Sequence, residues 1–78
     1  MSDNLITAGI EAFNFSQDTA SATWIINHNL NKQYPILDVR IDYNGQKVVM
    51  FPEAIEYTSP NTTTIIHSVE RTGTVRIV

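Results

Sequence analysis

Hydrophobic and polar residues alternate with a period of two along most of this chain, which is the pattern of β-strands that bury one face. The alternation is clearest in segment 34–43, where Leu37, Val39 and Ile41 share one face and charged residues occupy the other. We therefore predict a half-buried strand there. The same pattern predicts six further strands, at 10–15, 20–27, 46–51, 54–58, 62–68 and 74–78.

Turn signals separate these segments. Asn44-Gly45 is the strongest, because both residues accept the positive φ that a type I′ hairpin requires. A corner is expected at His28–Asn31, since asparagine tolerates left-handed backbone conformations. Short polar residues, Pro and Gly predict the other connections, at 16–18, 52–53, 59–61 and 69–73. The pattern as a whole predicts an all-β fold, a small antiparallel β-sandwich or barrel of about seven short strands.

The single tryptophan lies in the middle of a predicted strand. Alternation places Trp24 on one face with Ile26, and a buried indole contributes a large apolar area, so we expect it in the core rather than on a ligand platform. We divide the chain into an N-terminal arm, residues 1–9, and a single β-domain, residues 10–78. The arm is either flexible or loosely docked, or its apolar residues Leu5 and Ile6, together with Ile10, pack on a neighbouring subunit or a partner.

Size limits how much core this domain can have. The chain has 78 residues, and domains of this size need reinforcement from disulfides, a structural metal or oligomerisation. It has no cysteine, which excludes disulfides and thiolate metal sites. Oligomerisation is the reinforcement that stays open, and a homo-oligomer is expected.

The distribution of charge and hydropathy excludes two kinds of partner. The net charge is −3 and the five basic residues are scattered, whereas nucleic-acid binding needs clustered Lys and Arg. No apolar run approaches the roughly 18 residues that span a membrane. The N-terminus lacks the basic start and apolar core of a signal peptide, so the chain is expected to be made and used in the cytoplasm.

Candidate chemistry is sparse. His28 and His67 are too far apart in sequence for a local metal motif, and His28 has no carboxylate or nucleophile nearby in sequence. A nucleophile, a base and an orienting group cannot be assembled convincingly from the two histidines and the acidic residues. We expect His28 to be a structural residue that pins the corner and His67 to lie at the surface or rim. The row Asp38, Arg40, Asp42 is interpreted as a cross-strand charge ladder. No catalytic, cofactor-binding or metal residues are predicted.

Several motifs in order along the chain are familiar. Segment 13–17 reads F-N-F-S-Q, segment 23–30 reads T-W-I-I-N-H-N-L, and segment 72–78 reads T-G-T-V-R-I-V. With Pro52-Glu53-Ala54-Ile55 and Asn61-Thr62-Thr63-Thr64-Ile65 between them, they resemble a recurrent module of tailed-bacteriophage virion proteins, found at the end of tail fibres, tail spikes and baseplate proteins. Asn31 stands where that family usually has Gly.

The resemblance covers residues 13–78 and implies a function. It implies a non-enzymatic virion structural protein, a tail, baseplate or capsid-surface component, made in the host cytoplasm and carried in the virion. The implied partners are further copies of the chain, with a trimer favoured, and other virion proteins. Because no fibre shaft accompanies the module, a small structural subunit is favoured over a receptor-binding tip. The alternative is a receptor- or carbohydrate-binding module in which Tyr34, Tyr43 or Tyr57 stacks on a host surface glycan.

Overall fold

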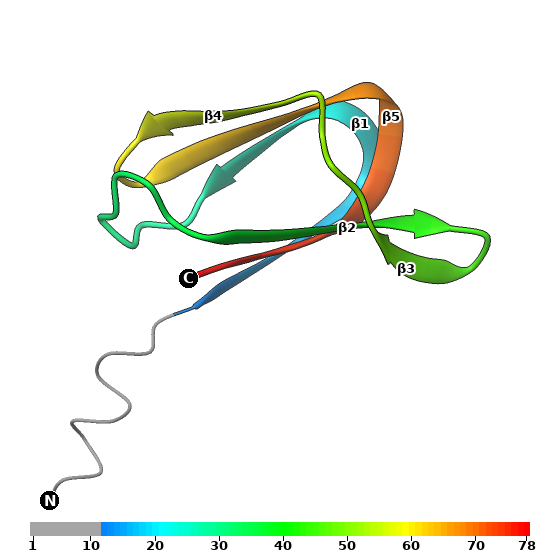
Figure 1. The fold of residues 1–78 in the computed structure, drawn as a ribbon, viewed down its shortest axis with the longest axis horizontal. Coiled ribbons are helices and arrows are strands. Elements are labelled where there is room, and N and C mark those ends of the chain that lie inside the picture. The colour runs from blue at the N-terminus through cyan, green and yellow to red at the C-terminus, as the bar shows by residue number, and fades with distance from the viewer. Residues whose placement is uncertain (1–11) are drawn as a thin grey trace, which may run out of the picture.

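The structure, a computed structural model, describes residues 12–78, and these form one antiparallel sheet (Figure 1). This confirms the all-β class. The order of strands in the sheet is β1-β5-β2-β3, with β4 paired to the first half of β5. The strands are β1 (Phe13–Asn27), β2 (Leu37–Tyr43), β3 (Gln46–Val49), β4 (Ala54–Ser59) and β5 (Thr62–Ile77).

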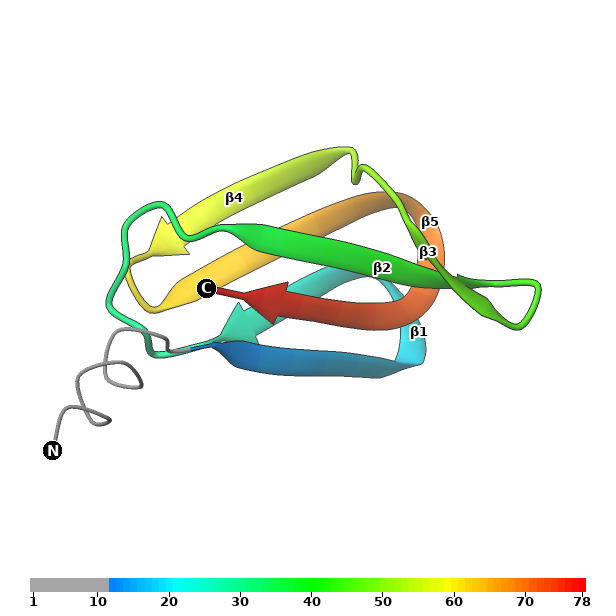
Figure 2. The same cartoon turned by 60° about the horizontal axis from the view of Figure 1, so that its bottom comes forward.

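The two long strands, β1 and β5, form a ribbon that turns back on itself (Figures 1 and 2). One half of the ribbon pairs residues 13–17 with 73–77, and the other half pairs residues 23–27 with 62–66. β4 pairs with β5 within residues 62–66, and β2 pairs with β5 within residues 73–77, so the two halves of β5 have different outer neighbours. Register shifts between Gln17 and Thr23 mark the bend.

The structure therefore has five strands where about seven were expected. The predicted turn at 16–18 lies within β1, and the predicted loop at 69–73 lies within β5. The physical reason is that these two segments face each other across the ribbon, Gln17 opposite Gly73 and Ser21 opposite Arg71. Two paired strands can bend together at a bulge while most of their ladder bonds are kept. Of the polar residues that suggested turns, Ser16, Asp18 and Glu70 are exposed, whereas Gln17, Arg71 and Thr72 are half-buried.

Trp24 is fixed beside the bend. Its indole N–H donates to the backbone carbonyl of Ser21 at 2.8 Å and to that of Arg71 at 3.2 Å. These carbonyls belong to the two strands of the ribbon, so one side chain ties both strands where their register slips. The prediction that Trp24 is a core residue is confirmed, since its side chain is fully buried.

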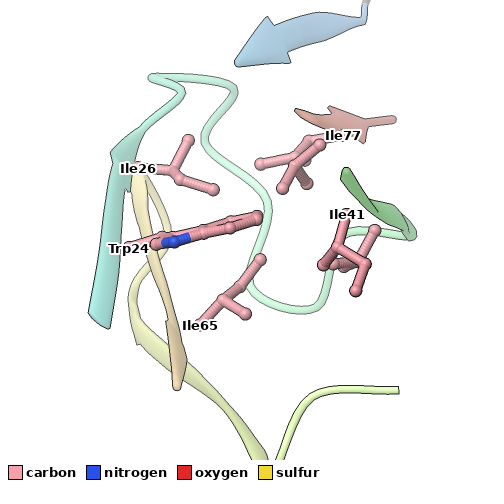
Figure 3. Close-up of a cluster of buried hydrophobic side chains, with 7 residues drawn as sticks. Trp24, Ile26, Ile41, Ile65 and Ile77 are labelled. Carbon is pink, nitrogen blue, oxygen red and sulfur yellow. The ribbon is translucent and has the colours of Figure 1, made fainter. Parts of the chain in front are cut away.

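The core lies between the two halves of the folded ribbon and β2. Figure 3 shows Trp24 at its centre, with isoleucines from three strands pointing toward it. Phe13, Phe15 and Leu30 are half-buried and pack against this cluster. The fully or nearly fully buried hydrophobic residues are Trp24, Ile26, Val39, Ile41, Ile65, Val75 and Ile77.

The predicted hairpin and corner are both confirmed. Asn44 and Gly45 have φ values of 53° and 78°, and they join β2 to β3 with Tyr43 paired to Gln46. Asn29 and Asn31 have φ values of 57° and 55°. Asparagine at position 31 thus adopts the left-handed conformation in which glycine is most common.

Gly73 has a different role from the one its sequence context indicates. We expected it to supply a tight return, but it lies in β5 between Gln17 and Ile41, and its φ is not positive. A Cβ atom at this position would lie 2.1 Å from the backbone oxygen of Arg40 and 2.8 Å from the Cα of Ile41. Glycine is needed here because the backbone of β2 lies too close to Gly73 of β5 to leave room for any side chain.

The end of the chain is paired. The N–H of Val78 donates to the carbonyl of Ile36 at 2.9 Å, and the N–H of Ile36 donates to the carbonyl of Val78 at 3.0 Å. This confirms the expectation that the last strand is held in a sheet. β2 begins at Leu37 rather than at 34. The predicted arm, residues 1–9, lies outside the described residues.

Candidate interaction surface

His28 is a structural histidine, as predicted. It is buried, and its Nδ1 accepts a hydrogen bond from the Leu30 backbone N–H at 3.1 Å. The ring proton therefore lies on Nε2, which faces the Thr63 hydroxyl at 3.3 Å. Burial lowers the pKa of the His28 imidazole below its usual 6.5, so the neutral ring that this network requires is favoured at neutral pH.

The turn between β4 and β5 holds the same corner from outside. The backbone N–H groups of Asn29 and Lys32 donate to the carbonyls of Asn61 and Pro60, at 3.2 and 2.8 Å. The Asn31 N–H donates to the side-chain oxygen of Asn61 at 2.8 Å. These bonds and His28 hold the corner in place as part of the framework.

His67 is buried, which corrects the expectation of a surface or rim position. Only 4% of it is exposed, and its ring lies edge-on to Trp24 with the ring centroids 4.3 Å apart. Its Nε2 has no hydrogen-bond partner among residues 12–78. Burial and then the positive charge of Arg71 lower its pKa below the usual 6.5. A neutral imidazole packed as an aromatic ring is the form that fits here.

The charged row on β2 forms ion pairs, as predicted, although only some of them run across strands. Arg40 pairs with Asp38 two residues away on the same strand at 3.1 Å, whereas Lys47 on β3 pairs with Asp42 across the hairpin. Thr72 of β5 also donates to Asp42 at 2.7 Å. These contacts from Lys47 and Thr72 lower the pKa of the Asp42 carboxyl. All are exposed, so each contributes little to stability.

The outer face of β1, β5 and β2 carries a hollow with a volume of about 420 Å³. Its polar rim follows the register of the sheet, because Asn14 and Asp38 flank Arg76, while Ser16 and Arg40 flank Thr74. The hollow is wide open and its floor is the sheet itself. It is the solvated face of a half-buried sheet.

A second surface is apolar. Phe51, in the connection after β3, is 90% exposed, which makes it the most exposed large hydrophobic residue that the structure describes. Beside it lies a hollow of about 200 Å³ between β2, the connection and the start of β4. We call Phe51 and this hollow the Phe51 surface. The hollow is lined by Leu37, Asp38, Val39, Val49, Met50, Phe51, Pro52 and Ile55.

The three tyrosines are exposed, and the structure brings two of them together. The rings of Tyr34 and Tyr57 meet edge to face with their centroids 5.3 Å apart, whereas Tyr43 stands alone at the end of the β2–β3 hairpin. Tyr34 is 71% exposed, so its ring offers one open face to solvent. This pair is the place where a sugar ring could stack.

The described residues offer few alternatives to an interaction surface. Among residues 12–78, no three His, Asp or Glu side chains gather where they could hold a metal ion. The same part of the chain contains no helix long and apolar enough to cross a membrane. Within it, β1 pairs only with β5, so the other edge of this 15-residue strand has no neighbouring strand there.

Sequence reasoning missed the importance of Phe51. The alternation predicts that Val48 and Met50 oppose Val49 and Phe51, and the structure confirms it, with the first pair half-buried and the second exposed. A signal was available, because segment 48–51 is apolar on both faces.

No protein family, curated protein or solved structure matches this chain.

Proposed function

We propose that this protein is a non-enzymatic structural component of a tailed-bacteriophage virion, in the tail, the baseplate or on the capsid surface. It acts by assembling with copies of itself, as a trimer, and with other virion proteins. The observation that carries the assembly role is the Phe51 surface, because an apolar knob and an apolar hollow side by side are features of protein interfaces. The virion assignment rests on the resemblance of residues 13–78.

The unpaired edge of β1 supports the same proposal. A long edge strand presents a row of backbone donors and acceptors that a free-standing protein usually blocks with charges, proline or a bulge. Among residues 13–27, Asp18 is the only charged residue, and it lies at the bend. Both straight halves of the edge are thus open to neighbours in an assembly.

Two measurements test this function. Analytical ultracentrifugation of the purified chain is expected to give a mass that is a multiple of 8.8 kDa, three times that value for the trimer. Quantitative mass spectrometry of virions purified from the producing culture is expected to detect the chain at a fixed ratio to the other particle proteins. A monomer at every concentration, together with absence from the particles, would contradict the proposal.

A carbohydrate-binding role is the second candidate, favoured by the exposed pair Tyr34 and Tyr57. Aromatic rings in such an arrangement give a sugar an apolar face to stack on. A glycan array probes this directly, with Tyr34→Ala expected to abolish binding and Tyr43→Ala, far from the pair in the fold, expected to keep it. An array without any bound glycan would exclude the role.

A further inference from the structure

The fold covers one of the two apolar faces of segment 48–51. The sequence there is Val-Val-Met-Phe, and continuous apolar runs of this kind belong to strands that are buried on both sides. Val48 and Met50 pack against the core. Val49 is 62% exposed and Phe51 is 90% exposed, so within the described residues nothing covers the second face.

The hollow beside Phe51 has the size and chemistry of a phenyl site. Its volume is about 200 Å³, and six of the seven residues that line it besides Phe51 are apolar, Asp38 being the exception. A cavity of about 150 Å³ lined by aliphatic side chains is large enough to bind benzene. Phe51 does not fill the hollow of its own chain, because its ring extends into solvent.

We propose that the Phe51 ring of one copy inserts into the hollow of a second copy of this chain. The proposal deepens the self-assembly part of the proposed function and rests on it. The Phe51 ring and the hollow are different features of one surface. When the ring of one copy enters the hollow of a second copy, the hollow of the first copy and the ring of the second copy stay unused. A closed rotational assembly uses all of them, and this contact therefore produces a closed oligomer.

The apolar area and the charges around the hollow favour a second copy of this chain as its occupant. Each inserted ring buries about 150–250 Å² of aromatic surface, together with the apolar walls around it. Insertion in a closed oligomer, with Val49, Pro52 and Ile55 at the margins, adds apolar area to each contact, and a specific interface needs roughly 1,000 Å² in total. Of the eight residues around the hollow, Asp38 alone is charged, and it is paired with Arg40, so no unpaired charge opposes the contact.

The first test compares two serine substitutions by sedimentation of the full chain over a dilution series. Phe51→Ser is expected to raise the dissociation constant on the order of 10- to 100-fold, the effect of leaving one phenyl ring unburied. Tyr43→Ser is the matched control, because Tyr43 is also an exposed aromatic residue, at 58%, but lies at the β2–β3 hairpin and does not line the hollow. It is expected to associate like the unmodified chain. Trp24 fluorescence checks that both variants are folded.

The second test identifies what the ring contacts. The photoreactive analogue p-benzoylphenylalanine is placed at position 51, and the protein is mixed with isotopically labelled unmodified chain before illumination. The cross-link is expected between an unlabelled and a labelled copy, at residues that line the hollow, such as Leu37 or Ile55. Because the link joins two differently labelled copies, it cannot arise within one chain.

Three outcomes would overturn the proposal. They are an unmodified chain that stays monomeric, an oligomer that Phe51→Ser leaves intact, and a cross-link outside the hollow. Each is distinguishable from failure of the proposed function. In the second and third cases the chain still assembles, through another surface, and in the first case virion composition still reports whether the protein belongs to the particle.

Discussion

Replacing Gly73 by alanine is expected to destabilise the fold by forcing β2 away from β5. The added Cβ would lie 2.1 Å from the Arg40 backbone oxygen, more than 1 Å inside the 3.4–4 Å of ordinary van der Waals contact. The obstacle is backbone in the middle of the sheet, and no side-chain rotation can relieve it. The position is also buried, and the strand on its other side, β1, pairs through Gln17.

The loss of stability caused by Gly73→Ala is the difference between two opposing effects. Overpacking of a buried site costs typically 1–3 kcal/mol, and an approach this short belongs at the upper end, about 3 kcal/mol. Alanine restricts the unfolded chain and returns about 0.4–1 kcal/mol. The net loss is therefore about 2–3 kcal/mol, a large part of the roughly 4–12 kcal/mol expected for a domain of this length.

Urea unfolding followed by fluorescence measures this loss, since the only tryptophan, Trp24, is fully buried. With a slope of about 1 kcal/mol per molar urea, the midpoint should fall by about 2–3 M. Gly45→Ala is the matched control, because its added Cβ meets nothing within 4 Å and only the φ of 78° is unfavourable. Its net cost is about 1 kcal/mol. A Gly73→Ala loss no larger than that of Gly45→Ala would refute the reasoning from close approach.

Three further outcomes are expected. Burial lowers the pKa values of His28 and His67, so the unfolded chain binds protons first as the pH falls. Stability is therefore full above about pH 6.5 and declines below it, and His67→Met should flatten this decline in urea midpoints. A flat profile of the unmodified chain would contradict the lowered pKa values. Trp24→Phe removes the N–H donor that the two carbonyls at the bend share, and it should lower the free energy of unfolding by about 2–3 kcal/mol, measured by thermal circular dichroism. An unchanged melting temperature would show that the N–H is dispensable. Asn44→Val places a β-branched residue at φ 53° and should cost about 1–2 kcal/mol, seen as faster amide exchange in the β2–β3 pair, while Asn44→Gly should leave exchange slow.

The features that the sequence predicts correctly are those whose cause is local. Asn44-Gly45 requires only the φ preferences of two adjacent residues, and the corner at Asn29 and Asn31 has the same basis. The bend of the ribbon is different, because it depends on residues 16–21 lying opposite residues 71–74. No local signal reports that pairing, so polar segments inside two continuous strands looked like turns.

The role of Gly73 could not be predicted for a similar reason. A glycine in a polar segment suggests a backbone that needs positive φ, and the sequence carries no trace of a neighbouring strand that comes too close. His67 is the opposite case. Alternation places it on the same face as Ile65, which is buried, and following that pattern would have predicted its burial. The usual surface preference of histidine misled the interpretation.

Two residues of the motifs that carry the resemblance have structural roles, whereas the exposed ring that would choose a partner lies outside those motifs, although Pro52 and Ile55, which belong to them, line the hollow. Trp24 ties the bend and His28 holds the corner, and both are buried, so neither can touch another protein. Phe51 lies outside the resembling motifs and is almost fully exposed. The fold and the choice of partner should therefore be separable in this chain. Replacing Phe51 should change the assembly behaviour and leave the fold, read from Trp24 fluorescence, unchanged.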